Sequence, residues 1–163
     1  MPGRCVGALA RYKMSAPAAN PAPPDTAAAH ERRAPLAFII DEESSIRQFV
    51  SLILQGGGID TIEFIDGASF RGIQPARMPN LVFLNVNLEV QDAIQSIESL
   101  SHAGFTGAVQ LISSRGSAVL DTVKHAGEQM KLRMLPVLKK PFETSAIQKI
   151  MACLLYTSDA ADE

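Results

Sequence analysis

Hydrophobic residues form short runs along the chain from residue 36 onward, and polar or glycine-rich segments separate the runs. Runs of this length, rich in Val, Ile, Leu and Phe, are typical of strands buried in a parallel sheet. They predict strands at residues 36–40, 60–65, 80–85, 107–113 and 133–138. Pro136 interrupts the last run, which suits a strand at the edge of the sheet.

Between these runs, apolar positions recur every three or four residues, the spacing of one face of a helix. Ser44 or Ser45 is expected to cap the first helix, and glycines 56–58 to end it. A short, weak helix is expected at residues 67–73. The other apolar faces are Ile46, Phe49, Val50, Ile53 and Leu54; Val90, Ala93, Ile94, Ile97 and Leu100; Val119, Leu120, Val123 and Ala126; and Ile147, Ile150, Met151 and Leu154.

The alternation of strand and helix predicts one α/β domain at residues 35–152, a (βα)5 sandwich of three layers with a parallel sheet between helices. Residues 1–34 are rich in Ala and Pro and are expected to form a flexible segment. Residues 153–163, CLLYTSDAADE, break the helical pattern and resemble a translated sequencing adapter. We therefore expect them to be an artefact that ends a truncated gene.

Composition and charge argue against several classes of function and site. The net charge of −2 and pI near 5.9 give no electrostatic reason to expect binding to nucleic acid or an anionic membrane. Cys5 and Cys153 lie near opposite ends of the chain, so the sequence indicates neither a disulfide framework nor a zinc site. No apolar run approaches the ~18 residues that a membrane span needs. A cytoplasmic protein is expected.

Polar residues with useful chemistry follow the predicted strands. Asp41-Glu42 follows the first strand, Asn85 ends the third with Asn87 just after it, Ser113 ends the fourth, and Lys140-Pro141 follows the fifth. The ends of parallel strands meet at one edge of a sheet, where α/β proteins bind their ligands. Carboxylate and backbone oxygens suit Mg²⁺, while a lysine and a hydroxyl suit a phosphoryl group.

These motifs resemble those of a receiver domain, the phosphorylation-controlled module of bacterial two-component response regulators. The resemblance covers residues 36–152 and rests on IIDEESSIRQFV, LVFLNVNLEVQDA, LISS and LKKPF. It implies a flavodoxin-like fold with strand order 2-1-3-4-5. It also implies that Asp41 and Glu42 bind Mg²⁺ with the backbone carbonyl of Asn87, that Ser113 is the switch hydroxyl, and that Lys140 binds phosphate before a cis bond to Pro141.

The sequence departs from the receiver pattern at Asn85, where the family has the aspartate that accepts phosphate from a histidine kinase. An amide has no anionic oxygen with which to attack phosphorus, so the standard reaction should be lost. The missing charge should also weaken Mg²⁺ binding. Val137 replaces the usual aromatic switch residue, and Glu89 the usual proline, which weakens the expected coupling of phosphorylation to the fifth strand.

The main hypothesis is therefore a degenerate receiver that is not an enzyme and acts as a regulatory and docking module. Its expected partners are a histidine kinase, an output domain, or a second copy bound through the face from the fourth strand to the fifth helix. Residues 107–142 are similar to receivers that precede EAL-type cyclic-di-GMP phosphodiesterase domains, so any such domain would lie in a missing C-terminal part.

Two alternatives remain open. The domain could still be phosphorylated with Mg²⁺ at Asp41, Asp92 or a hydroxyl, although Asp92 more readily fits a helix-capping role. It could instead be a flavodoxin-like domain that binds a small molecule, but it lacks a glycine-rich phosphate loop. His30, His102 and His125 have no partners at ligand spacing and are expected at the surface.

Overall fold

The structure is a computed structural model that describes residues 33–73, 75–86, 90–114 and 117–162, with residues 117 and 156–162 described by their backbone alone. Residues 1–32, which make up most of the predicted N-terminal segment, lie outside the described residues. From Ala34 onward the chain forms one compact unit, which holds the predicted α/β domain.

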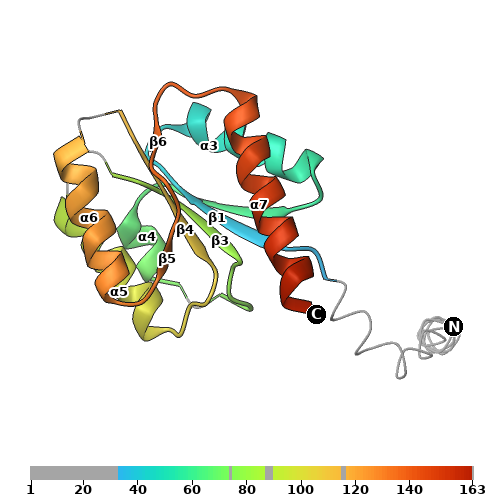
Figure 1. Cartoon of the computed structure of the whole chain (residues 1–163). Helices are drawn as coiled ribbons and strands as arrows, with labels where there is room; N and C mark the ends of the chain where they lie inside the picture. The colour runs from blue at the N-terminus through green and yellow to red at the C-terminus, as the bar shows by residue number, and fades with distance from the viewer. Residues whose placement is uncertain (1–32, 74, 87–89, 115–116, 163) are drawn as a thin grey trace, which may run out of the picture. The chain divides into compact units, whose positions relative to one another are not determined.

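A parallel sheet runs through the centre of this unit, in the order β2-β1-β3-β4-β5 with β6 also pairing with β4 (Figure 1). This is the strand order that the receiver resemblance implied. The strands are β1 (Leu36–Ile40), β2 (Asp60–Phe64), β3 (Leu81–Asn85), β4 (Ala108–Ser113), β5 (Arg133–Met134) and β6 (Leu138–Lys139).

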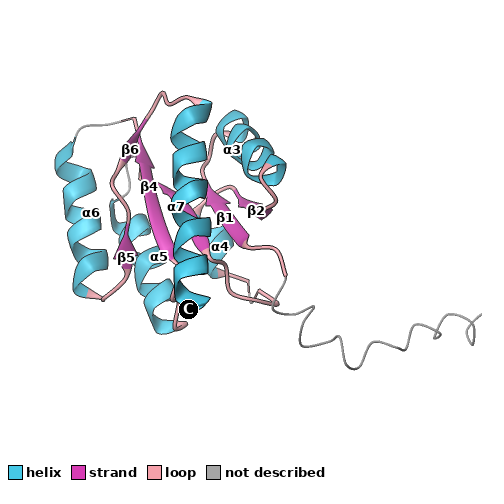
Figure 2. Cartoon of the chain, turned by 45° about the vertical axis from the view of Figure 1, so that its right-hand side comes forward, coloured by secondary structure: helices cyan, strands magenta, loops and turns pink. Residues whose placement is uncertain are grey.

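Helices cover both faces of the sheet and complete the three layers (Figure 2). α3 (Ser44–Gly56) and α7 (Thr144–Asp162) lie on one face. The other face carries α4 (Gly67–Arg71), α5 (Val90–His102) and α6 (Ser117–Gln129). Among the described residues, none of the helices combines the length and apolar character needed to cross a membrane.

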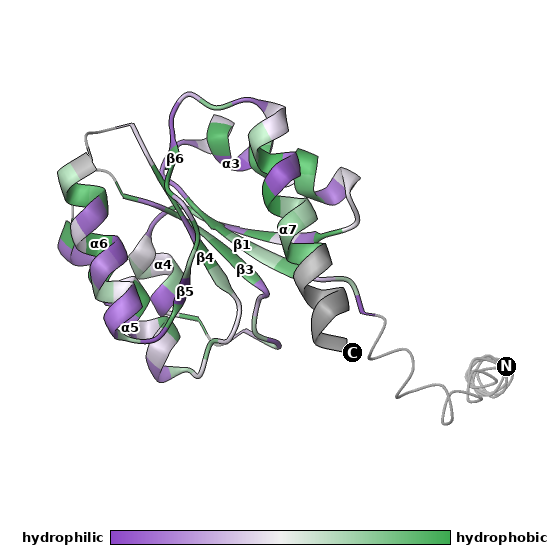
Figure 3. Ribbon diagram, viewed as in Figure 1, coloured by the Kyte–Doolittle hydropathy of each residue, from purple (hydrophilic) through white to green (hydrophobic). Residues whose placement is uncertain are grey.

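Each face of the sheet has its own hydrophobic core, because successive side chains of a strand point to opposite faces. Phe38 of β1 belongs to the core under α4–α6, where its ring packs edge-on against Phe64 and Phe70. Ile39 belongs to the core under α3 and α7, where it is joined by Ile147. Figure 3 shows the resulting hydrophobic strands between helices whose outer surfaces are more polar.

The predicted fifth strand is divided into two pieces. β5 and β6 each pair with β4 over two residues, and residues 135–137 separate them. Pro136 has no N–H to donate, so the ladder cannot run through it. The buried side chain of Gln110 on β4 donates instead to the Pro136 carbonyl at 2.7 Å. The prediction of a continuous strand over 133–138 is therefore wrong.

Two predictions about helix ends are also wrong. Glu43, not Ser44 or Ser45, is the N-cap of α3, and it makes no side-chain capping hydrogen bond. The helical pattern was expected to break at Cys153, yet α7 continues through Asp162. Leu154, which was expected on the apolar face of this helix, is buried in the core. The glycine stop of α3 is confirmed, because the chain turns through Gly58 with φ of 88°, a conformation that favours glycine.

Candidate functional site

The parallel sheet brings its polar strand ends to one edge. β1 and β3 pair with Ile40 beside Leu84, so the next residues, Asp41 and Asn85, stand at neighbouring strand ends. Asn85 pairs in turn with Ile112 of β4. The backbone thus places the acidic turn after β1 next to the end of β3, as the sequence predicted.

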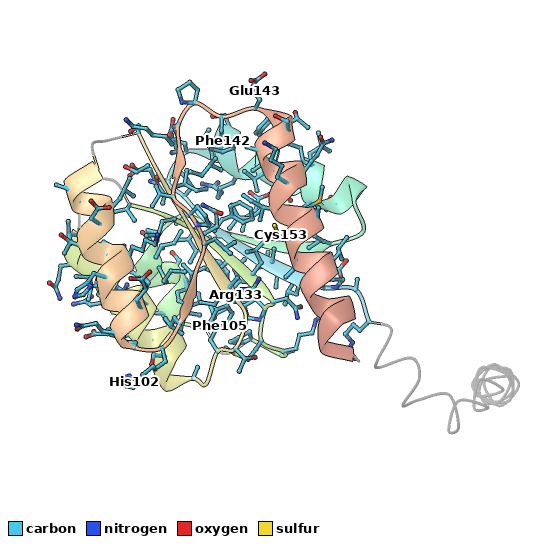
Figure 4. All side chains as sticks on the ribbon, viewed as in Figure 1. His102, Phe105, Arg133, Phe142, Glu143 and Cys153 are labelled. Atoms are coloured by element: carbon cyan, nitrogen blue, oxygen red, sulfur yellow. The ribbon has the colours of Figure 1, made fainter. Side chains whose placement is uncertain are left out.

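The last strands complete the same edge. Ser113 pairs with Lys139 of β6, and the backbone N–H of Lys140 donates to the Ser113 carbonyl at 2.8 Å. The peptide bond between Lys140 and Pro141 is cis, as the resemblance implied. Figure 4 shows Phe142, which follows, at the end of the sheet where the strands terminate. We call the residues gathered here the strand-end site: Asp41, Glu42, Glu43, Asn85, Ser113 and Lys140.

Lys140 forms ion pairs with two carboxylates of this site. Its Nζ lies 2.9 Å from Oδ2 of Asp41 and 2.7 Å from Oε1 of Glu43, to which it also donates a hydrogen bond. The Asp41 side chain is fully buried and the Lys140 side chain is 9% exposed, whereas Glu43 is 56% exposed. The pair with Asp41 is therefore shielded from water, and the pair with Glu43 is partly solvated.

These pairs change the acid–base behaviour of Lys140. Burial of the ammonium lowers the pKa of Lys140, but the hydrogen bond to Glu43, the close contact with Asp41 and the negative charges of both carboxylates outweigh that effect. The net result is a pKa above the usual value of 10.5. Lys140 therefore stays protonated at neutral pH and acts as a permanent positive charge in the site.

The two carboxylate oxygens of Asp41 have different environments. Oδ1 accepts a hydrogen bond from the backbone N–H of Glu43 at 2.9 Å. Oδ2 is buried and accepts no well-directed hydrogen bond, although the Lys140 ammonium lies within ion-pairing distance. We therefore describe the Lys140 contact as an ion pair. Oδ2 keeps lone pairs to offer to a cation.

A magnesium ion fits this donor set in part. The spare lone pairs of Asp41 Oδ2 and the nearby carboxylate of Glu42 are the hard oxygen ligands that Mg²⁺ prefers. Position 85 adds a neutral amide in place of a third carboxylate. Among the residues that the structure describes, no group of three or more His, Cys, Asp or Glu is arranged to hold a metal. Asp41 and Glu42 are thus the carboxylates that would contact a magnesium ion here.

Arg47 of α3 holds the acidic turn after β1 in place. Its Nη1 donates to the carbonyl of Asp41 at 2.7 Å and to that of Glu42 at 3.3 Å. Its Nε pairs with Glu63 of β2 at 3.2 Å. The guanidinium thus joins the turn to the neighbouring strand, and it holds the backbone from which the carboxylates of the site project.

The remaining predicted residues differ in how well the structure places them. Ser113 is buried and Asn85 is half-buried, and both lie on the strand-end edge. Glu42 follows Asp41 directly and is exposed. Asn87 and Glu89 lie outside the described residues.

Asp92, the candidate for substitute phosphorylation, belongs to a different cluster. It lies in the first turn of α5, and its Oδ1 pairs with Nη1 of Arg71 on α4 at 3.0 Å. The same Arg71 nitrogen donates to the buried Ser96 hydroxyl at 2.9 Å. Asp92 therefore ties α4 to α5, where the sequence had suggested a capping role. His102 and His125 are exposed, as predicted.

Sequence reasoning missed Glu43 and Arg47. Each had a signal: Glu43 is the third acid of the run DEE, and Arg47 follows it by one helical turn. Spacing alone does not show that Lys140, far along the chain, pairs with Glu43. It also does not show that the Arg47 side chain turns back to the carbonyls of Asp41 and Glu42.

Comparisons with known proteins agree with this architecture. No family model matches the sequence. The tetrathionate response regulatory protein TtrR of Salmonella typhimurium is 25% identical over 123 residues, which are 76% of this chain and 57% of that protein. The chain thus matches little more than half the length of this curated relative.

Solved structures of small receiver proteins superpose on nearly their whole length. The chemotaxis protein CheY4 of Vibrio cholerae aligns with a TM-score of 0.61 and 19% identity, over 74% of this chain and 98% of that one. A response regulator receiver protein of Pseudoalteromonas atlantica aligns with a TM-score of 0.62 and 17% identity, over 76% and 99%. With its 2-1-3-4-5 sheet and helices on both faces, the chain has the fold of a response-regulator receiver domain.

Proposed function

We propose that this chain is the receiver domain of a two-component response regulator that has lost the standard phosphoacceptor and works as a cytoplasmic docking module. The observation that carries the proposal is the amide of Asn85 at the end of β3, beside an acidic turn and a buried lysine pair. An aspartate at this place would form an acyl phosphate, and an amide offers no anionic oxygen for the attack.

The other residues of the site take the roles that the family resemblance suggests. Asp41 and Glu42, with the backbone carbonyl of Asn87, would hold Mg²⁺ weakly, and Ser113 and Lys140 would contact a phosphoryl group. When bound, the metal would neutralise phosphate oxygens. Asp41 and Asp92 are poor substitutes for the lost acceptor, because each carboxylate is already paired with a cation, Lys140 and Arg71 respectively.

The proposed partners are a histidine kinase, an output domain, or a second copy of the chain. The face that we propose for docking runs from β4 through α6, β5 and β6 to α7. Val137 between β5 and β6 is half-buried against the core, where receivers usually carry an aromatic switch residue. From the similarity to receivers that precede EAL domains, we propose a cyclic-di-GMP phosphodiesterase as the output domain.

Phosphorylation chemistry tests the proposal directly. Wild-type protein incubated with Mg²⁺ and acetyl phosphate should show no added phosphoryl group by intact mass spectrometry. Asn85→Asp should gain one, because it restores the anionic nucleophile beside Lys140 and the acidic turn. Asn85→Ala, which changes the same position without adding a carboxylate, serves as the matched control and should stay unmodified.

Two results would overturn parts of the proposal. A stable adduct on the wild type, mapped to Asp41, Asp92 or a hydroxyl, would contradict the loss of the acceptor reaction. A folded Asn85→Asp variant that remains unmodified would contradict the roles given to Ser113, Lys140 and the acidic pair.

A further inference from the structure

The geometry points to Lys140 as the resident cation of the strand-end site: its ammonium, held by Asp41 and Glu43, competes with a divalent ion for Asp41. Glu43 has no part in the proposed function and is inferred here to be the residue that positions Lys140. The inference rests on the proposed receiver function only for the identity of the competing ion, Mg²⁺.

The first argument is the position of the ammonium. Lys140 Nζ lies 2.9 Å from Oδ2 of Asp41, the same buried oxygen that has lone pairs to offer to a metal. A metal bound to that oxygen would stand within a few ångströms of the ammonium. Two positive charges so close repel strongly where little water screens them. Mg²⁺ can therefore bind Asp41 closely only if Lys140 moves away.

The second argument is that Glu43 holds the ammonium in place. Its Oε1 accepts a hydrogen bond from Lys140 Nζ at 2.7 Å, and its backbone N–H donates to Oδ1 of Asp41 at 2.9 Å. Arg47 fixes the same turn through the carbonyls of Asp41 and Glu42. The two carboxylates are thus presented to Lys140 by one short, well-anchored turn.

The third argument is charge balance at the strand-end edge. With Asn85 in place of an acid, the ammonium has two charged partners here, Asp41 and Glu43. One positive charge offsets half of their combined negative charge, so less attraction remains for a dication. A lysine that is part of the chain also binds at a high effective concentration, since no free ion must be captured.

Magnesium affinity of charge-matched variants tests the inference. Lys140→Met keeps most of the aliphatic length and removes the charge, and it should bind Mg²⁺ at least about tenfold more tightly than wild type. Lys139→Met removes the same charge one residue earlier, from an exposed side chain of β6, and should change the affinity by less than about twofold. The affinities can be measured by NMR titration with MgCl₂, using backbone amides around Asp41.

The role of Glu43 is tested on the metal-free protein. Glu43→Gln should speed the exchange of the Lys140 ammonium protons with water, followed by NMR of the side chain, because it removes one of the two carboxylates that hold the ammonium. Glu143→Gln, which changes an exposed acid three residues after Lys140, is the control and should leave that exchange rate unchanged.

Equal Mg²⁺ affinities of Lys140→Met and Lys139→Met would overturn the inference. An exchange rate of the Lys140 ammonium protons that is the same in Glu43→Gln and in wild type would also overturn it. These outcomes are independent of the proposed function, which fails only in the phosphorylation experiment. Circular dichroism and amide NMR spectra establish that each variant is folded. If Lys140→Met unfolds without metal, Lys140→Gln replaces it in the same titration.

Discussion

At the scale of single residues, the proposed function depends on the side chain of Asn85. Asn85 carries an uncharged amide where an aspartate would carry an oxygen anion, and the carboxylate of Asp41 is buried and paired with Lys140. The site keeps the lysine and the acidic turn of a receiver. Under the proposed function, the site therefore lacks the nucleophile of a receiver and retains much of its electrostatic surroundings.

The Lys140 ion pairs should give the folded protein a pH-dependent stability. Because the pKa of Lys140 is raised on folding, its contribution is fully present below the unfolded value of about 10.5 and is lost as pH rises through the higher folded value. The difference in unfolding free energy between wild type and Lys140→Met should stay constant from neutral pH to about 10 and then shrink.

Urea denaturation at a series of pH values measures this difference, and Lys139→Met provides the comparison for general charge effects. A difference that falls steadily from neutral pH would contradict the raised pKa of Lys140.

Most of the site could be predicted at this scale, but one partnership could not. Strand ends in a parallel sheet converge by topology, so Asp41, Asn85, Ser113 and Lys140 were placed on one edge from the pattern alone. The pairing of Lys140 with Glu43 depends on the side-chain direction at a helix N-terminus, which periodicity does not encode.

At the scale of elements, strong periodicity predicted the helices well, whereas hydrophobicity alone did not predict where a strand is interrupted. α5 was correctly predicted, since an apolar stripe of five residues admits only one buried face. The fifth strand was predicted as one piece because its hydrophobicity is continuous. Pro136 divides it, and the hydrogen bond from Gln110 compensates the carbonyl left out of the ladder.

The C-terminal part of α7 should stabilise the fold through the face of the helix that packs against the core. Leu154 is 7% exposed and belongs to the core under α3 and α7, whereas its neighbour Leu155 is 40% exposed. Leu154→Ala should lower the unfolding free energy by about 2–3 kcal/mol, and Leu155→Ala by less than ~1 kcal/mol.

Chemical denaturation of the two variants compares the same substitution at adjacent positions. Equal losses would contradict the packing of α7 at Leu154, which lies in the segment that the sequence suggested was foreign to the domain.

At the scale of the whole molecule, two hydrophobic cores share a single central sheet. Phe83 and Val82, adjacent on β3, are both fully buried and point to different cores. Folding is therefore driven by apolar burial on both faces of the sheet. The charged side chains of Asp41, Glu43 and Lys140 lie at the edge of this sheet and belong to neither core.

Removal of divalent ions should consequently leave the fold unchanged. Wild-type protein should melt at the same temperature in EDTA and in millimolar Mg²⁺, within about 1 °C, since Lys140 already neutralises Asp41. In Lys140→Met, where two carboxylates lose their counter-charge, Mg²⁺ should raise the melting temperature. Differential scanning calorimetry distinguishes the cases, and a large Mg²⁺-dependent rise in the wild type would contradict a weak site.

The lysine–glutamate contact also has a consequence for how the domain assembles. Lys140 and Glu43 are 97 positions apart, so their contact closes a loop that contains nearly every strand and helix of the domain. Ordering so long a loop costs considerable chain entropy, and the contact can offset this cost only once the loop is ordered. The contact should therefore form late in folding, and an exchange-labelling experiment that follows the amide of Lys140 would report when the last strand has docked.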